Sequence, residues 1–115
     1  KKNSSFEEDD HRHFNRNGEA FNVGETFAGI EFEKGVELSN EIDWIARDRE
    51  SMTTAALKWI LEHEEVSCVI PGFKNIDQVK QNLKAVAVPD FTKEEMEKLK
   101  TFYEQEVHGL IRGAY

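Results

Sequence analysis

One short run of apolar residues, Val66 to Ile70, stands out from the pattern of polar and apolar positions along the chain. A short, apolar, β-branched run is typical of a strand that is buried on both faces. Pro71-Gly72 ends it, because proline lacks the donor of a sheet and glycine permits a tight turn. Asn75 is a good helix N-cap, with Gln78 placed to complete a capping box. The pattern predicts a strand, a short loop and a helix.

Three further helices follow from apolar residues at helical spacing. One spans Val36 to Arg47, and a second begins near Thr53, a plausible cap, and ends at about Glu64. The third begins at the capping box Thr92-Lys93-Glu94-Glu95, where Phe91 can contact Met96, and extends to roughly Gln105. Apart from Val66 to Ile70, the pattern contains no convincing strand.

The first thirty residues are polar and glycine-punctuated, which predicts a long loop rather than a helix or strand. The cluster Asp9-Asp10-His11-Arg12-His13 offers ligand types that zinc accepts. However, His11 and His13 are two positions apart and no second ligand pair follows at a recognised spacing. We therefore interpret the cluster as a solvated charged loop and expect no metal site.

The composition of the chain argues against certain classes of binding partner. The chain has 115 residues and a formal net charge of -8, which argues against nucleic acid or an anionic membrane as a partner. No apolar run approaches the ~20 residues of a membrane span. The single Cys68 lies in the predicted buried strand and has no intrachain partner, which fits a reducing cytoplasm.

A lone buried strand leaves its backbone hydrogen-bonding groups unpaired, and that is costly. The partner strands must therefore come from a missing part of the protein or from another copy. The lone strand thus indicates a fragment.

The loop before the predicted α-helix at Asn75 has chemistry that suits an anion. The first turn of a helix presents unpaired N–H groups and the positive end of its dipole, which attract phosphate. Lys74 adds a mobile positive charge. Most turns of this kind in α/β proteins bind nothing, so local chemistry leaves both a phosphate site and a purely structural turn open.

The segment Ile70-Pro71-Gly72-Phe73-Lys74-Asn75-Ile76-Asp77-Gln78-Val79-Lys80-Gln81-Asn82 resembles the nucleotide-binding segment of the aldo-keto reductases. Two other stretches, Asp9 to Arg16 and Ala56 to Leu61, resemble the bacterial branch of that family. The resemblance implies an α/β fold, the C-terminal third of a (β/α)8 TIM barrel, itself mostly helical with about one strand. Residues 1–35 would be the long loop after barrel strand 7. Residues 36–115 would hold helices, the last barrel strand, the NADPH-binding loop and the C-terminal helix.

The resemblance also implies that seven residues of that segment bind the cofactor. Gly72 and Phe73 would line the loop, while Lys74 and Asn75 would bind the 2′-phosphate of NADPH. The other three are amides further along the predicted helix, namely Gln78, Gln81 and Asn82. Gln78 replaces a frequent arginine and Gln81 a frequent glutamate, whereas Asn82 matches the asparagine that reads the adenine amino edge. Glutamine lacks the charge of arginine, which weakens a preference for NADPH, and Lys74 restores part of that charge. We therefore expect NADPH as the cofactor, with NADH as its alternative.

The implied reaction is hydride transfer between the nicotinamide and the carbonyl carbon of a small aldehyde or ketone. The family's catalytic aspartate, tyrosine, lysine and histidine belong to the upstream part of the barrel, so none is assigned here, and we expect the chain alone to be inactive. One alternative is a channel-associated relative that binds NADPH as a sensor. Another is a small helical protein-interaction module. Exposed apolar surface would favour self-association of the fragment.

Overall fold

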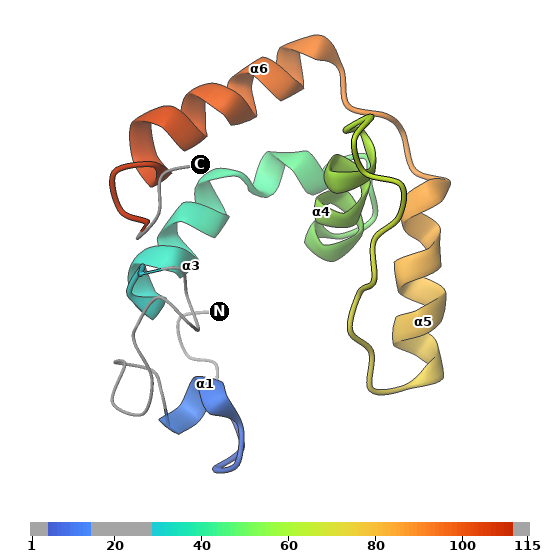
Figure 1. Cartoon of the computed structure of the whole chain (residues 1–115). Helices are drawn as coiled ribbons and strands as arrows, with labels where there is room; N and C mark the ends of the chain where they lie inside the picture. Colours follow the sequence, from blue (N-terminus) through green and yellow to red (C-terminus); the bar gives the residue numbers. More distant parts are fainter. Residues whose placement is uncertain (1–4, 15–28, 112–115) are drawn as a thin grey trace. The chain divides into compact units, whose positions relative to one another are not determined.

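The computed structural model describes residues 5–14 and 29–111 of the chain (Figure 1). Over these residues it contains helices and turns but no β-strand. The helices are, in chain order, α1 (His11–Phe14), α3 (Phe32–Glu41), η1 (Asp43–Ala46), α4 (Met52–Leu61), α5 (Ile76–Leu83), η2 (Lys84–Val86), α6 (Lys93–Phe102) and η3 (Tyr103–Val107). Asn15 and Arg16, part of one segment that carried the resemblance, lie outside the described residues, as does most of the predicted N-terminal loop.

The described residues belong to two compact units, one from residues 1–42 and 98–115 and the other from residues 43–97. In the first unit, the ring of Phe6 meets that of Phe32 edge-on, with 5.8 Å between centroids. The guanidinium of Arg12 lies 4.4 Å from the centroid of the Phe6 ring and also pairs with Asp10. Leu38 of α3 is buried. These contacts join the start of the chain to α3.

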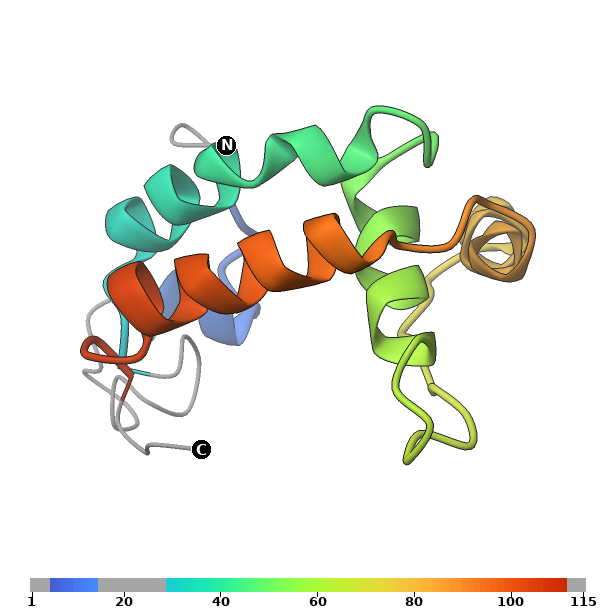
Figure 2. The same ribbon diagram turned by 90° about the horizontal axis from the view of Figure 1, so that it is seen from above.

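The second unit is built on α4, which packs against η1, η2 and α5. Its buried residues come from η1, α4, η2 and the stretches that follow η1 and precede α6, namely Ile45, Arg49, Thr54, Ala55, Ala85, Val88 and Phe91, and none comes from α5. Residues 66–73 run beside α5 before the chain turns back into that helix, and Figure 2 views α5 nearly along its axis. This unit contains every predicted cofactor residue.

The predicted strand at Val66 to Ile70 is wrong for this chain. The segment is extended beside α4 and α5, but within the described residues it forms no backbone pairing of a β-sheet. Ile70 is 93% exposed. Cys68, predicted to be buried, is also exposed. A strand needs a neighbour to satisfy its backbone groups, and the described residues supply none. The sequence pattern therefore identified an apolar segment correctly but not its state in this chain.

The helix boundaries also differ from those predicted. The helix expected at 36–47 is divided into α3, which begins earlier at Phe32, and the 3-10 turn η1. The cap of α4 is Ser51 rather than Thr53, because the Ser51 Oγ accepts a hydrogen bond from the Thr54 N–H at 3.1 Å. The helix α4 also ends at Leu61, three residues before the predicted end.

The capping box of α6 is confirmed. The Thr92 Oγ1 accepts from the Glu95 N–H at 3.1 Å, and the Glu95 carboxylate accepts from the Thr92 N–H at 2.8 Å. The helix α6 ends at Phe102, and the turn η3 continues it as a π-helix to Val107. The predicted contact between Phe91 and Met96 stays a prediction.

The buried Arg49 forms hydrogen bonds both to η1 and to the first turn of α6. Arg49 is 4% exposed, and its guanidinium donates to both oxygens of Glu95 at 3.0 and 2.8 Å. The same group donates to the carbonyls of Ile45, Pro89 and Asp90, at 3.1, 2.9 and 2.8 Å respectively. It also lies 3.8 Å from the centroid of the Phe91 ring. Every polar group of this buried cation thus has a partner, as burial of a charge requires.

Candidate functional site

The loop that carries the predicted nucleotide site ends in a well-formed helix cap. The Asn75 Oδ1 accepts from the Gln78 N–H at 2.9 Å, which confirms Asn75 as the N-cap of α5. The second bond of the predicted capping box, from the Asn75 backbone N–H to the Gln78 side chain, is not formed. The Gln78 Oε1 accepts from the backbone N–H of Lys74 rather than from that of Asn75. Gln78 therefore closes the loop onto the first turn of α5.

A second amide holds the loop from further along α5. The Nδ2 of Asn82 donates to the carbonyl oxygen of Gly72 at 3.3 Å. Since a carbonyl only accepts, this bond fixes which end of the amide faces Gly72. The Oδ1 of Asn82 is then left as an acceptor, the group needed to receive a hydrogen bond from an amino group such as that of adenine.

Gln81 is directed away from the loop. Its Nε2 donates at 3.3 Å to the Oγ of Ser51, the same oxygen that caps α4. The structure therefore brings Gly72, Lys74, Gln78 and Asn82 together around Asn75, but uses Gln81 to join α5 to the start of α4. Ser51 was missed in the sequence, although a serine three positions before Thr54 is an ordinary N-cap signal.

Several side chains of the loop and of the first turn of α5 are exposed to solvent. Phe73 is 64% exposed, and Lys74, Asn75 and Gln78 are exposed as well. Within the described residues, the Lys74 ammonium makes no ion pair. The electrostatics are mixed, because the exposed carboxylate of Asp77 lies in the first turn of α5. Lys74 and the helix dipole favour an anion there, and Asp77 opposes it.

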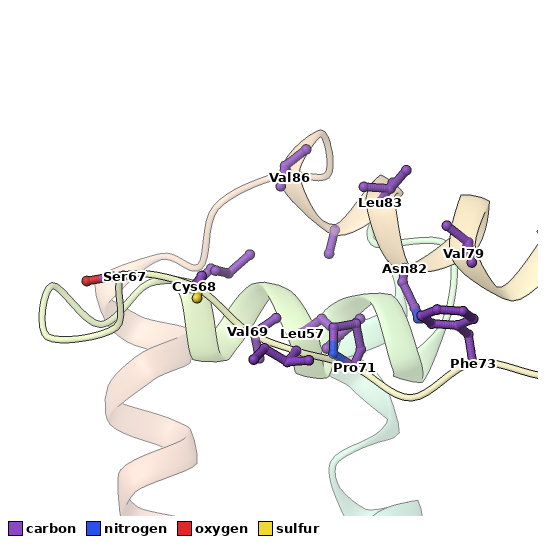
Figure 3. Close-up of a pocket in the computed structure, with 13 residues that line it drawn as sticks. Leu57, Ser67, Cys68, Val69, Pro71, Phe73, Val79, Asn82, Leu83 and Val86 are labelled. Carbon is purple, nitrogen blue, oxygen red and sulfur yellow. The ribbon is translucent and has the colours of Figure 1, made fainter.

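An apolar groove of about 490 Å³ lies between residues 67–73, α4 and α5 (Figure 3). Leu57 lines it from α4, Val79 and Leu83 from α5, and Val69 from the extended segment. The polar side chains among its lining residues are those of Ser67 and Asn82. A groove of this composition suits apolar side chains rather than a charged nucleotide.

A second cation of this unit, Lys58, is held by two carboxylates. It forms ion pairs with Asp90 and, at 3.1 Å, with Glu62. The hydrogen bond to Asp90 raises the pKa of Lys58, and the same bond lowers the pKa of Asp90 below its ordinary value. Lys58 and Asp90 are therefore engaged in an ion pair within the fold.

The described residues offer neither a metal site nor a membrane-spanning helix. Over the described ranges, no group of three or more histidine, cysteine, aspartate or glutamate side chains is placed to hold a metal ion. The prediction of a loop at Asp9 to His13 is wrong in part, because His11–Phe14 form the short helix α1, before which Asp10 accepts two hydrogen bonds from the Arg12 guanidinium, at 2.9 and 2.6 Å. None of the described helices is long and apolar enough to cross a membrane.

The extended segment leads through a bend at Lys74 and Asn75 into the capped helix α5. The sequence model of the aldo/keto reductase family matches residues 1–104. The chain belongs to this family, whose members are oxidoreductases built on a TIM barrel and generally use NAD(P)H. No significant match was found among curated proteins or solved structures.

Proposed function

We propose that this chain is the C-terminal third of the barrel of an NAD(P)H-dependent aldo-keto reductase. In this proposal it carries the segment that binds the adenosine 2′-phosphate, and the intact protein reduces a small aldehyde or ketone in the cytoplasm. The family match supports the class of reaction. The observation that carries the site is the loop from Gly72 to Asn75, which is closed onto α5 by Gln78 and Asn82 while its cation stays exposed.

The donors of this loop fit a phosphate on a ribose. Lys74 supplies a charge, and the amide nitrogen of Asn75 remains a donor because its oxygen caps α5. The backbone N–H groups of Gly72 and Phe73 have no hydrogen-bond partner among the described residues. A charge-assisted hydrogen bond contributes about 1.5–3 kcal/mol and a neutral one about 0.5–1.5, so Lys74 would be the main source of NADPH preference. The dinucleotide, when bound, supplies the hydride.

The exposed apolar groove favours a barrel segment over an independent interaction module. Ile70, Leu83 and Val86 are 93%, 65% and 72% exposed. A domain that folds to completion on its own would bury most side chains of this size, whereas a barrel segment needs adjoining strands to cover them. The catalytic aspartate, tyrosine, lysine and histidine would lie on those upstream strands. The chain alone is therefore expected to consume no NADPH in the presence of an aldehyde.

Nucleotide binding can be tested on the 115-residue chain by NMR with 15N-labelled protein. Adenosine 2′,5′-bisphosphate should shift the amide signals of Gly72, Phe73, Lys74 and Asn75, and adenosine 5′-monophosphate should shift them less. Lys74→Ala should remove most of the difference between the two nucleotides. The matched control is Lys80→Ala, a lysine of α5 outside the loop. Equal responses to the two nucleotides would refute the assignment of the 2′-phosphate site.

A further inference from the structure

Two side-chain contacts join the helix that carries the predicted nucleotide residues to the turn before α4. The Gln81 Nε2 of α5 donates to the Ser51 Oγ at 3.3 Å. The Lys84 ammonium of η2 forms an ion pair with the adjacent Glu50 at 2.7 Å. The partners lie 30 and 34 positions apart in the sequence. Both contacts therefore end at the same turn, residues 50–51.

The Ser51 hydroxyl is fixed by its bonds within α4. Its oxygen accepts from the Thr54 N–H at 3.1 Å and lies 2.8 Å from the Thr54 Oγ1. A hydroxyl oxygen has two acceptor sites, and the Thr54 N–H and the Gln81 amide fill both. The Ser51 hydrogen is then donated to the Oγ1 of Thr54, a residue that is 0% exposed. Ser51 is thus a firmly held acceptor for Gln81.

The Gln81 end of this bond is held much less firmly. Gln81 is exposed, and its bond to Ser51 joins two neutral groups at the surface. A bond of this kind is readily exchanged for a bond to a ligand. The next residue, Asn82, donates instead to the Gly72 carbonyl of the nucleotide loop. Since successive side chains of an α-helix diverge by about 100°, the two amides are directed at different elements.

We propose that Ser51 regulates the nucleotide site by withholding Gln81 from it. The inference rests on the proposed function, in which Gln81 is one of the residues that bind the cofactor. In the empty site Ser51 holds the Gln81 amide. An adenine nucleotide draws this amide towards Asn82 and breaks its bond to Ser51, while the ion pair of Lys84 with Glu50 keeps α5 against α4. Ser51 is therefore a positioning residue whose bond lowers the affinity for the nucleotide.

The test is NMR titration of the 15N-labelled 115-residue chain with adenosine 2′,5′-bisphosphate. Ser51→Gly removes the acceptor of Gln81 but keeps most of the helix cap, because glycine is also accepted at the N-cap. This variant should bind the nucleotide about two- to tenfold more tightly, the range that one neutral hydrogen bond spans. Ser51→Thr keeps the hydroxyl and is the matched control, which should bind as the unmodified chain does.

Gln81→Ala separates this mechanism from a purely structural role of Ser51. Without Gln81 there is no amide to withhold, so adding Ser51→Gly to Gln81→Ala should change the affinity no further. The side-chain amide signals of Gln81 give a second readout. In the unmodified chain they should shift when the nucleotide binds, and in Ser51→Gly they should already be shifted before it is added.

Three outcomes would contradict the proposal. If Ser51→Gly binds no more tightly while the amides of Gly72 to Asn75 still respond, Ser51 does not withhold Gln81, and the nucleotide site itself stands. An equal gain from Ser51→Gly with and without Gln81 would also overturn the proposal. If the loop amides respond to the nucleotide in none of the variants, the proposed nucleotide site is refuted, and the role of Ser51 with it.

Discussion

Glu95→Gln tests the contribution of the carboxylate that accompanies the buried Arg49. The Arg49 guanidinium donates to both Glu95 oxygens, and Thr92 donates its backbone N–H to the same carboxylate. These hydrogen bonds, that of Arg49 foremost, lower the pKa of Glu95 from an ordinary 4.5 to about 2. The charged form of Glu95 is therefore favoured by folding.

The size of the effect follows from this difference in pKa. A shift of one unit corresponds to about 1.36 kcal/mol, so a shift from 4.5 to about 2 gives an upper value of about 3 kcal/mol. Because the Glu95 side chain is 25% exposed, solvent screening reduces this to about 2 kcal/mol. The stabilisation is fully present above pH 4.5 and is lost as the pH falls through 4.5 towards 2, because the folded state holds the depressed pKa.

The assay is urea denaturation followed by the fluorescence of Trp44 and Trp59, repeated from neutral pH down to about pH 3. Glu95→Gln should lose about 3 kcal/mol at neutral pH, since it leaves a buried cation without its partner. It should also show a shallower fall in stability below about pH 5 than the unmodified chain. Glu97→Gln removes a carboxylate from the same helix without touching Arg49, and it should keep the original pH dependence. If Glu95→Gln also kept that dependence, the assignment to this ion pair would be refuted.

Two further predictions concern single contacts in the same unit. Asn75→Ala should lower the free energy of unfolding by about 1 kcal/mol through loss of the α5 cap, whereas Asn75→Ser should retain most of it; equal losses in chemical denaturation would contradict the capping role. The pKa of Asp90 should lie below its ordinary value of 3.8 because Lys58 bonds to it. In a carbon-detected NMR titration, Lys58→Met should bring this pKa back up and Lys58→Arg should not, while an unchanged value in Lys58→Met would contradict the ion pair.

Local chemistry was readable from the sequence. The cap at Asn75 and the capping box from Thr92 to Glu95 depend on residues three positions apart, and both are confirmed. The strand at Val66 to Ile70 was not readable in this way, because whether an apolar run becomes a strand depends on a neighbour distant in sequence. Without that neighbour the same residues stay extended, and Ser67, Cys68 and Ile70 are exposed.

The hydrogen bonds of the buried Arg49 also depend on partners that are distant in sequence, and they could not be predicted from local patterns. Its main partners, Pro89, Asp90 and Glu95, lie 40, 41 and 46 positions away. A single arginine after a predicted helix carries no sequence signal that separates a buried cation from a solvated one. The positions of the helices were predicted better than their boundaries, since apolar spacing is local, but Ser51 rather than Thr53 proved to be the cap of α4.

The nucleotide residues were predicted from the resemblance rather than from the pattern, and their hydrogen bonds divide them into two groups. Gln78 and Asn82 bond to the loop, whereas Gln81 bonds to Ser51. A family position can thus keep its place on the helix while its side chain serves the fold. The resemblance could not foresee this, because Gln81 departs from the frequent glutamate and its partner lies 30 positions earlier.

These bonds bear on how the loop would distinguish NADPH from NADH. The backbone N–H of Lys74 is already satisfied by Gln78, so it is not free to bind a phosphate unless that bond opens. Recognition of the 2′-phosphate would then depend on the Lys74 ammonium and on neutral donors, against the nearby carboxylate of Asp77. Interactions between exposed charges weaken as salt rises. We therefore infer that any preference for NADPH in this protein decreases with ionic strength. We also infer that it is modest, and weaker than the preference of a loop with arginine at position 78.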